Sequence, residues 1–265
     1  MPMFEQDLEI AFHVPVVPGV FCMGLRSPEM VAVAEPGQFV MVRIGDRLDP
    51  LLRRPFSICG RRGREVFILL YAVVGQGTGL MSRLNAGERV SVLGPLGKGF
   101  EMAGHDSAPI LVAGGIGIAP LFFLAQCLRP GPMTFLAGFG SAGQIIDPAP
   151  LGLGDLNMEI ATDDGTRGHH GSVTDLLKPH LNGAGDRKGV IYACGPGAML
   201  RRTGALAREQ GVPCQVSLET VMACGLGVCQ GCAVPAAEKE PRSYHLVCQH
   251  GPVFQAEALD WKTHD

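Results

Sequence analysis

Four cysteines near the C-terminus constrain this chain more than any other feature of its sequence. Cys224, Cys229 and Cys232 lie within the stretch ETVMACGLGVCQGCAVP, and Cys248 follows in YHLVCQHGPVF. A Cys-x4-Cys-x2-Cys loop with a more distant fourth cysteine is the spacing of plant-type [2Fe-2S] sites. The glycines between the cysteines let the loop turn tightly, so that backbone N–H groups can point at the sulfurs. The spacing therefore predicts that these four cysteines are the ligands of a [2Fe-2S] cluster.

Other interpretations of these cysteines remain open. Structural zinc also takes four thiolates, although zinc sites are usually built from two separated Cys-x2-Cys pairs and three of these cysteines share one loop. Four buried free thiols are the plainest alternative, because cysteine is often fully buried. His250 forms a Cys-x-His with Cys248, but a Rieske centre needs two such pairs and is rejected. The spacing favours the diiron cluster over zinc, and zinc over free thiols.

The composition is that of a globular protein without a strongly charged partner. Of 265 residues, 46% are hydrophobic and 18% are charged, which is enough apolar material for a substantial core. The net charge of −3 is too small to favour nucleic acid or an acidic membrane surface as a partner. The N-terminus, MPMFEQDLEIAF, is acidic where a secretion signal would be basic and then apolar. We therefore expect a cytoplasmic protein whose nine cysteines are thiols or metal ligands.

One uncharged stretch raises the question of a membrane span. Residues 107–128, SAPILVAGGIGIAPLFFLAQCL, are numerous enough to cross a bilayer. Glycines and a proline divide this stretch into an apolar strand, a loop and a short helix, however. A strand buried on both faces of a parallel sheet also reads as a continuous apolar run. We therefore expect neither a membrane span nor a membrane partner.

The first part of the chain, residues 1–104, reads as a series of short strands. Segments such as FVMVRI, RPFSICG, EVFILLYAVV and RVSVLG are rich in Val, Ile, Leu and Phe, with Gly, Pro and charged turns between them. Strands of this kind without a long helix predict a small antiparallel barrel. GPLGKGFEMAGHDSAP then changes to Gly, Pro and polar residues, which places a domain boundary near residue 105.

Strands and helices alternate in the second part, residues 105–218. PILVAGG, MTFLAGF, MEIAT, VIYACG and CQVSLE read as strands, whereas APLFFLAQCL, GSVTDLLKPHL and GPGAMLRRTGALAREQG read as helices. This alternation predicts a doubly wound parallel sheet of about five strands. Residues 219–265 are loop-rich and hold the four cysteines, so we expect a small third unit there. The predicted fold class is a β-barrel plus an α/β nucleotide domain, followed by a cluster-binding unit.

Glycine-rich junctions in both larger parts are typical of phosphate-binding sites. RRPFS places an arginine and a hydroxyl beside a rigid proline, which suits a pyrophosphate and a flavin edge. LYAVVGQGTG adds an aromatic ring and free backbone N–H groups. AGGIGIAP and ACGPGAM each join a strand to a helix, where the phosphates of a dinucleotide meet a helix N-terminus. Neither matches G-x-G-x-x-G, and each motif taken alone is also compatible with an ordinary turn or a solvated strand edge.

Taken together, these motifs resemble the ferredoxin–NADP reductase superfamily. RPFS and GQGT resemble its FAD site, and GGIGIAP and CGPGAM resemble its nicotinamide domain. SLETVMACGLGVCQGCAVP and VCQHGPVF, with GPLGKGF and ATDDGTRGHHGSVTDLL, are similar to the electron-transfer subunits of class 1B dihydroorotate dehydrogenases. The resemblance covers nearly the whole chain, and the cysteine loop with GPVF is its most specific part.

The resemblance implies which motif residues hold each cofactor, and it assigns no catalytic residue. The phosphate and ring of FAD would be held by Arg54, Pro55, Phe56 and Ser57. The other side of FAD would be lined by Leu70, Tyr71 and Ala72, and its pyrophosphate would be bound by Gly77 and Thr78. NAD would be approached by Gly114, Gly115 and Gly117, with its nicotinamide near Cys194, Gly195 and Pro196. The segment SAGQIIDPAPL has no Lys or Arg for a 2′-phosphate, which favours NAD over NADP and leaves Arg167, Arg201 and Arg202 as candidates for such a contact.

The resemblance also implies a partner and a direction for the chemistry. A flavin accepts two electrons at once and releases them singly, so it can join NAD(H) to a one-electron cluster. In this family the partner is an FMN-containing subunit that oxidises dihydroorotate to orotate in pyrimidine biosynthesis, and two copies of each subunit form a heterotetramer. Electrons would pass from FMN through the [2Fe-2S] cluster and FAD to NAD⁺. The His169–His170 pair lies between glycines and is more typical of a solvated loop than of an acid–base site.

Two rival functions remain open at this stage. The small flavin and iron–sulfur subunit of a transhydrogenase or a sulfide dehydrogenase has the same architecture. A zinc-stabilised docking protein without a redox role belongs to a different class. Iron, zinc and flavin content separates the docking protein from the electron carriers.

Overall fold

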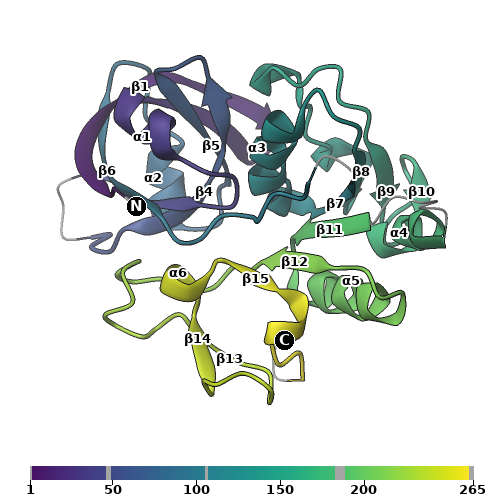
Figure 1. Ribbon diagram of the computed structural model, residues 1–265. Coiled ribbons are helices and arrows are strands. Elements are labelled where there is room, and N and C mark those ends of the chain that lie inside the picture. Colours follow the sequence, from purple (N-terminus) through teal and green to yellow (C-terminus); the bar gives the residue numbers. More distant parts are fainter. Residues whose placement is uncertain (1, 46–48, 105–106, 183–188, 263–265) are drawn as a thin grey trace.

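Antiparallel strands from the first hundred residues close into a barrel, at the upper left of Figure 1. The computed structural model describes residues 2–45, 49–104, 107–182 and 189–262. Strands follow one another around the barrel in the order β1-β2-β5-β4-β3-β6, and the side chains of Ile10, Met23 and Ile58 are fully buried in its core. The antiparallel barrel is therefore confirmed. Its strands are β1 (Phe4–Val17), β2 (Val20–Arg26), β3 (Phe39–Arg43), β4 (Arg54–Arg62), β5 (Val66–Ala72) and β6 (Arg89–Leu96).

Two features of the barrel go beyond what the sequence pattern predicts. The pattern does not mark β2 as a strand, because Gly24 interrupts its apolar run. In the structure the ring of Phe12 fills the space where a side chain at position 24 would project. The GQGTG motif, which the sequence marks only as a glycine-rich junction, contributes to the short helix α2 (Gln76–Met81), and a second short helix, α1 (Pro28–Val33), precedes β3.

A seven-stranded sheet forms the second part, with the strand order β10-β9-β8-β7-β11-β12-β15. All neighbouring pairs are parallel except β12 and β15. The winding direction reverses between β7 and β11, and nucleotides bind beyond the carboxyl ends of the strands at such a reversal. The doubly wound sheet is confirmed, with β10 and β15 added to the five predicted strands. The bounds are β7 (Ala108–Gly114), β8 (Thr134–Phe139), β9 (Glu159–Thr162), β10 (His169–His170), β11 (Gly189–Cys194), β12 (Cys214–Ser217) and β15 (Val253–Gln255).

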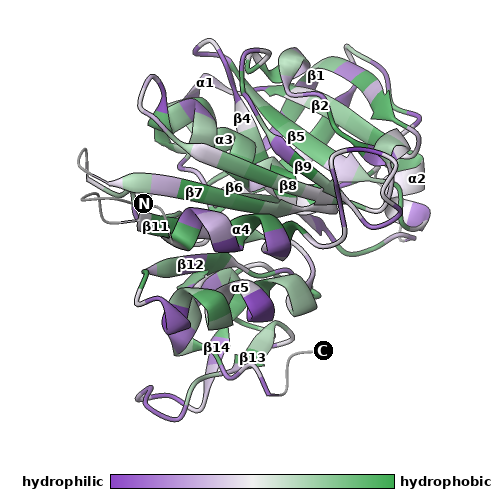
Figure 2. Ribbon diagram, turned by 90° about the vertical axis from the view of Figure 1, so that its right-hand side faces the viewer, coloured by the Kyte–Doolittle hydropathy of each residue, from purple (hydrophilic) through white to green (hydrophobic). Residues whose placement is uncertain are grey.

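Helices cover the sheet on the side toward the barrel and on the outside. Helix α3 packs against strand β4 of the barrel, whereas α4 and α5 lie side by side and carry hydrophilic segments on their visible faces (Figure 2). The uncharged stretch 108–128 is divided into β7, η1 and α3, and the described part of the chain contains no helix long and apolar enough to cross a membrane. The helices are α3 (Ile118–Leu128), α4 (Val173–Asn182) and α5 (Gly197–Glu209), with the 3₁₀ turns η1 (Gly115–Gly117), η2 (Ala142–Gln144) and η3 (Ala149–Leu151).

The C-terminal unit lies below the barrel and the sheet in Figure 1. It contains β13 (Ala233–Pro235), β14 (Tyr244–Leu246), α6 (Val247–His250) and η4 (Ala256–Ala258). Strand β15 then leaves this unit and pairs with β12 at the edge of the large sheet. The predicted domain boundaries at 104/105 and 218/219 stay predictions, and residues 105–106 lie outside the described residues.

One glutamine attaches the sheet domain to the barrel. The side chain of Gln126, on α3, accepts a hydrogen bond from the backbone N–H of Arg61 at 2.9 Å and donates one to the carbonyl oxygen of Arg61 at 2.8 Å. Strand β4 has a register irregularity between Ile58 and Gly60, directly before this point. The amide of Gln126 therefore satisfies backbone groups much as a neighbouring strand would.

We expect Gln126→Ala to lower the free energy of unfolding by about 1–3 kcal/mol, because both backbone groups of Arg61 lose their partner. Urea unfolding followed by circular dichroism measures this change. Gln144→Ala, at an exposed position on η2, is the matched control and should change stability by less than about 0.5 kcal/mol. Equal stability of the two variants would contradict the attachment described here.

Candidate functional site

A pocket of about 340 Å³ opens where the barrel, the sheet and the C-terminal unit meet. Its size is within the range of ligand sites in proteins. Strands β4 and β5 supply the barrel wall, where the rings of Phe56 and Tyr71 meet in a T-shaped contact with centroids 5.6 Å apart. Gly77, on α2, lies against the guanidinium of Arg54. The pocket wall contains eight of the nine residues predicted to hold FAD: Arg54, Pro55, Phe56, Ser57, Leu70, Tyr71, Ala72 and Thr78.

The hydroxyl of Thr78 shapes the turn that begins α2. Its oxygen accepts hydrogen bonds from the N–H groups of Val74 at 2.9 Å and Gly75 at 3.2 Å, and it donates one to the carbonyl oxygen of Gly75 at 3.1 Å. These bonds hold the first turn of the helix in a fixed shape beside the pocket. In this structure Thr78 therefore acts on the turn, while its side chain also lines the pocket.

The two glycine-rich junctions of the sheet lie against each other. A Cβ at Gly117 would lie 2.6 Å from the backbone nitrogen of Gly195, and one at Gly114 would lie 2.7 Å from Cδ of Pro196. Only glycine permits backbone contacts this close. Ile116, inside the first junction, reaches the wall of the pocket. The structure thus brings the residues predicted to bind NAD to the border of the residues predicted to bind FAD.

Part of the pocket wall comes from residues 218–222, which no sequence motif predicts as binding residues. Leu218, Glu219, Thr220 and Met222 line the pocket directly after strand β12. Glu219 is exposed to solvent at the mouth of the pocket, but partial desolvation by the surrounding wall raises the pKa of its carboxyl. Burial also raises the pKa of the Cys194 thiol, and the nearby charge of Glu219 adds to this effect. The position of SLET just before the cysteine loop is the sequence signal that could have indicated this wall.

The cysteine loop directs backbone N–H groups at its sulfurs, as the sequence predicts. Cys224 Sγ accepts from the N–H groups of Leu226 at 3.4 Å and Cys229 at 3.5 Å, and Cys248 Sγ accepts from Gly227 at 3.1 Å. Burial acts to raise the pKa of Cys224, but the N–H groups of Cys229 and Leu226 together lower it to about 6. Such donors stabilise a thiolate, which is the form that binds metal.

The four cysteines are arranged as two pairs, and this arrangement fits a diiron cluster. Cys232 Sγ and Cys248 Sγ are 3.3 Å apart, and a thiol contact joins Cys224 to Cys229. A [2Fe-2S] cluster needs two thiolates at each iron. Among the described residues, no group of three or more Cys, His, Asp or Glu side chains is arranged to hold one metal ion. The assignment of the four ligands stays a prediction that the paired sulfurs favour.

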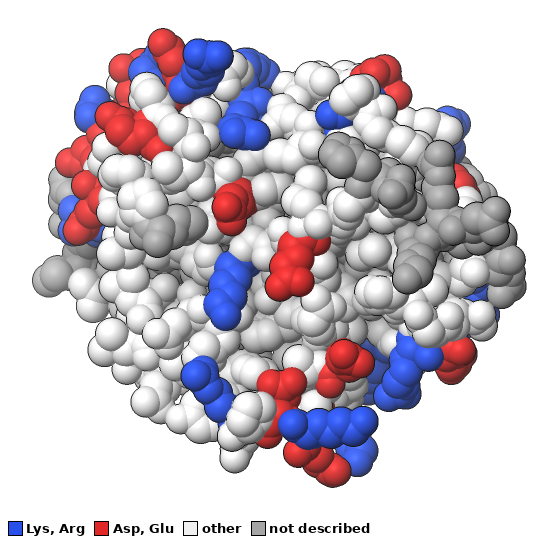
Figure 3. Space-filling model, in the orientation of Figure 1, with Lys and Arg blue, Asp and Glu red and all other residues white. Residues whose placement is uncertain are grey.

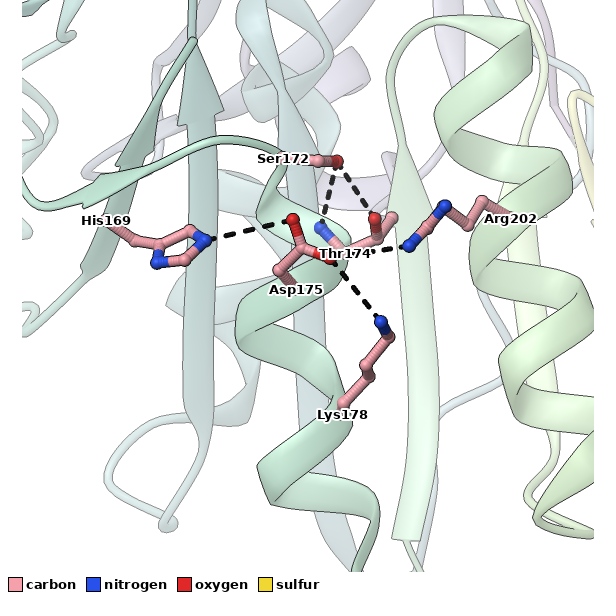
Figure 4. A network of polar contacts seen from close by, with 6 residues as sticks. All are labelled: His169, Ser172, Thr174, Asp175, Lys178 and Arg202. Atoms are coloured by element: carbon pink, nitrogen blue, oxygen red, sulfur yellow. Dashed lines mark hydrogen bonds and ion pairs between the residues drawn. The ribbon is translucent and has the colours of Figure 1, made fainter. Parts of the chain in front are cut away.

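A polar network centred on Asp175 engages three basic side chains near the start of α4 (Figure 4). The carboxylate of Asp175 lies 3.4 Å from Arg202, 3.6 Å from Lys178 and 3.7 Å from His169. Burial acts to raise the pKa of Asp175, but Lys178 and Arg202 lower it overall. His169 and His170 are exposed, as expected, although they form the edge strand β10 rather than a loop. Arg202, one candidate for a 2′-phosphate contact, is therefore paired with a carboxylate.

Known proteins similar to this chain share both its sequence and its architecture. Residues 219–260 match the family model described as the iron-sulfur cluster binding domain of dihydroorotate dehydrogenase B. The chain is 39% identical over 259 residues to the dihydroorotate dehydrogenase B (NAD(+)) electron transfer subunit of Desulforamulus reducens, with 97% of this chain and 98% of that protein covered. To the subunit of the same name from Listeria welshimeri it is 37% identical over 263 residues, covering 97% and 99%.

Solved structures give the same picture of the fold. A chain from the structure of an NADH-dependent reduced ferredoxin-NADP oxidoreductase matches with a TM-score of 0.83 and 29% identity, covering 98% of this chain and 91% of that one. The ferredoxin NADP+ reductase from Neisseria gonorrhoeae, solved with FAD and NADP bound, matches with a TM-score of 0.62 and 15% identity, covering 78% and 92%. The second likeness shows the fold alone.

The Asp175 network predicts a small, acid-sensitive contribution to stability. Because the folded pKa of Asp175 is lowered, the network stabilises the protein above the unfolded pKa of about 3.9, and this stabilisation is lost as the pH falls through the folded pKa. We expect Asp175→Asn to cost up to about 1 kcal/mol at pH 7, a limit set by solvent exposure, and less in strong acid. Urea unfolding at both pH values measures this, with exposed Asp163→Asn as the control. A larger cost in acid than at pH 7 would contradict the prediction.

Proposed function

This chain belongs to the family of dihydroorotate dehydrogenase B electron transfer subunits, and we propose that it carries electrons from a dihydroorotate-oxidising partner to NAD⁺ through a [2Fe-2S] cluster and FAD that it binds itself. It is an oxidoreductase subunit of pyrimidine biosynthesis. The cluster would exchange single electrons, and the flavin would couple them to the two-electron chemistry of NAD. All nine cysteines are free thiols, which is typical of a reducing compartment, and we place the protein in the cytoplasm.

One segment carries this proposal, because it belongs to both redox sites. Leu218, Glu219, Thr220 and Met222 line the pocket, and Cys224 follows two residues after Met222 as the first predicted cluster ligand. Fewer than ten residues of chain therefore separate the two sites, which limits their separation to a short distance. A short distance between two redox centres is what direct electron transfer between them requires.

The residues of the barrel and the sheet have separate tasks in the proposed site. Arg54, beside Gly77 on α2, would bind the FAD pyrophosphate, since a guanidinium suits phosphate oxygens. Phe56 and Tyr71 would pack against the flavin ring with their apolar faces. The junctions at Gly114 and Gly195 would let the nicotinamide approach the same pocket. The pairing of Arg202 with Asp175 supports NAD as the nucleotide rather than NADP.

The partner would dock on the surface around the cysteine loop. Cys229 is exposed, and so are the apolar side chains of Val221 and Val228, which are 83% and 79% accessible. Figure 3 shows few charged side chains at the lower left of its face, where Figure 1 places the loop before β13. Exposed apolar groups of this kind are typical of protein interfaces. We therefore propose that the FMN-containing subunit covers this loop, in a heterotetramer of two copies of each subunit.

A second function is favoured by one observation, the likeness to the NADH-dependent reduced ferredoxin-NADP oxidoreductase chain. In that case the partner would be a larger flavin and iron–sulfur subunit rather than a dihydroorotate-oxidising one. The two functions differ in the electron donor that reduces the chain. Co-purification with the native partner, followed by tests with dihydroorotate and with NADPH, distinguishes them.

We expect the anaerobically purified chain to contain FAD and about two irons. The Cys229→Ser variant should lose the cluster. When this variant is mixed with the FMN subunit, it should also fail to reduce NAD⁺ with electrons from dihydroorotate. NADH oxidation by a dye that accepts electrons from FAD should survive, because the pocket is untouched. Cys127→Ser removes a half-buried thiol far along the sequence from the loop and is the matched control. Iron analysis, visible spectra and NADH formation are the measurements.

Two results would count against this function. Full coupled activity in Cys229→Ser would place the cluster outside the electron route. One zinc per chain with no colour would instead support the zinc-stabilised docking protein.

A further inference from the structure

One histidine outside the pocket contacts Tyr71 in the pocket wall and Leu84 in the segment that follows helix α2. The imidazole of His13, on β1, has its Nδ1 atom 2.7 Å from the carbonyl oxygen of Leu84 and its Nε2 atom 2.8 Å from the hydroxyl of Tyr71. A carbonyl can only accept a hydrogen bond, so Nδ1 carries a proton and donates it to Leu84. In the neutral ring Nε2 is then an acceptor, and the Tyr71 hydroxyl donates to it. The two contacts therefore fix one tautomer of His13 and one direction of the tyrosine O–H.

The contact between His13 and Tyr71 holds the aromatic wall of the pocket. Tyr71 lines the pocket and is only 2% exposed, so its hydroxyl has little access to water. Its ring lies nearly parallel to those of His13 and Phe21, at centroid distances of 6.0 and 5.9 Å. Burial raises the pKa of the Tyr71 phenol, so the hydroxyl keeps its proton and stays a donor. The hydrogen bond to His13 turns that donor into the barrel, while the ring stays in the pocket wall.

The contact between His13 and Leu84 holds the segment that follows helix α2. The N–H of Leu84 donates to the carbonyl oxygen of Met81, the last residue of α2. The same helix carries Gly77 and Thr78. His13 is thus linked through Leu84 to α2 and through Tyr71 to β5, the two elements that would bind the pyrophosphate and the ring of one FAD molecule.

We propose that His13 is a positioning residue for FAD, which sets the place of the Tyr71 ring relative to helix α2 without touching the cofactor. This inference rests on the proposed FAD site. Without the imidazole the Tyr71 hydroxyl would be buried with no partner, and the ring would shift to reach one. The two halves of the site would then no longer be held at the spacing that one FAD molecule requires.

Amide variants separate the two contacts of His13. Asn places its N–H₂ near the position of Nδ1, so His13→Asn keeps a donor for Leu84 and loses the acceptor for Tyr71. Gln reaches the position of Nε2, so His13→Gln keeps an acceptor for Tyr71. His13→Leu removes both contacts, and Tyr71→Phe keeps the ring but removes the hydroxyl. Asn85→Ala, at an exposed position next to Leu84, is the control.

The measurements are the dissociation constant of FAD for the apoprotein, the visible spectrum of the bound flavin and the urea midpoint of the apoprotein. We expect His13→Leu and His13→Asn to weaken FAD binding roughly five- to tenfold, the equivalent of about one lost hydrogen bond. His13→Gln should recover most of the affinity and the wild-type spectrum. In the Tyr71→Phe background the difference between Gln and Asn should vanish, because the acceptor then has no donor to bind. A purely structural role would lower the urea midpoint of the apoprotein without this pattern of rescue.

Several results would overturn the proposal. Unchanged FAD affinity and spectrum in His13→Leu would do so while leaving the FAD site itself intact. A Gln–Asn difference that persists with Tyr71→Phe would show that His13 does not act through the tyrosine. Should His13→Leu fail to fold, wild-type FAD affinity and spectrum in His13→Asn would decide against the proposal. A wild-type chain that binds no FAD under these conditions would overturn the proposed function as well.

Discussion

The site depends above all on the pairing of strand β15, from the C-terminal part of the chain, with the edge strand β12 of the large sheet. Strand β15 pairs with β12, and the N–H of Leu218 donates to the carbonyl oxygen of Pro252 at 2.9 Å. The barrel joins the same place, because the N–H of Lys98 donates to the carbonyl oxygen of Gly251 at 2.6 Å. Main-chain hydrogen bonds therefore attach the cysteine unit to both neighbours. Pro252, at this crossing point, is itself part of the pocket wall.

Much of the fold is predictable from the sequence because its signals are local. The apolar runs of β7 and β8 and the turn residues around them identify a parallel sheet without any knowledge of tertiary contacts. The cysteine spacing likewise lies in one loop, apart from Cys248. Strand β2 is different, because Gly24 makes sense only once the ring of Phe12 is seen beside it. Strand β15 has just three residues, too few for any periodic pattern to mark it.

In the candidate site too, residues with a local sequence signal could be predicted and residues placed by tertiary contacts could not. Motif residues such as Arg54 and Ser57 carry their own signal, since a charged or hydroxyl group beside a proline is unusual within an apolar strand. Glu219 and Met222 carry only an indirect signal, their position just before the cysteine loop, because their place in the pocket wall depends on how three units of the chain meet. The role of His13 is even harder to predict from the sequence. It lies in strand β1, where most residues are at least partly exposed, and its two partners are 58 and 71 residues away along the chain.

A site assembled from three units responds to substitution differently from one built on a single element. The pocket wall comes from β4 and β5, from the η1 junction and from residues 218–222, so no unit contains it alone. Each attachment between units, such as the amide of Gln126 on the backbone of Arg61, is worth only about 1–3 kcal/mol when it is removed. Losing one would leave the fold intact while changing the distances between the walls. Because electron and hydride transfer both depend steeply on distance, function should respond to these attachments more strongly than stability does.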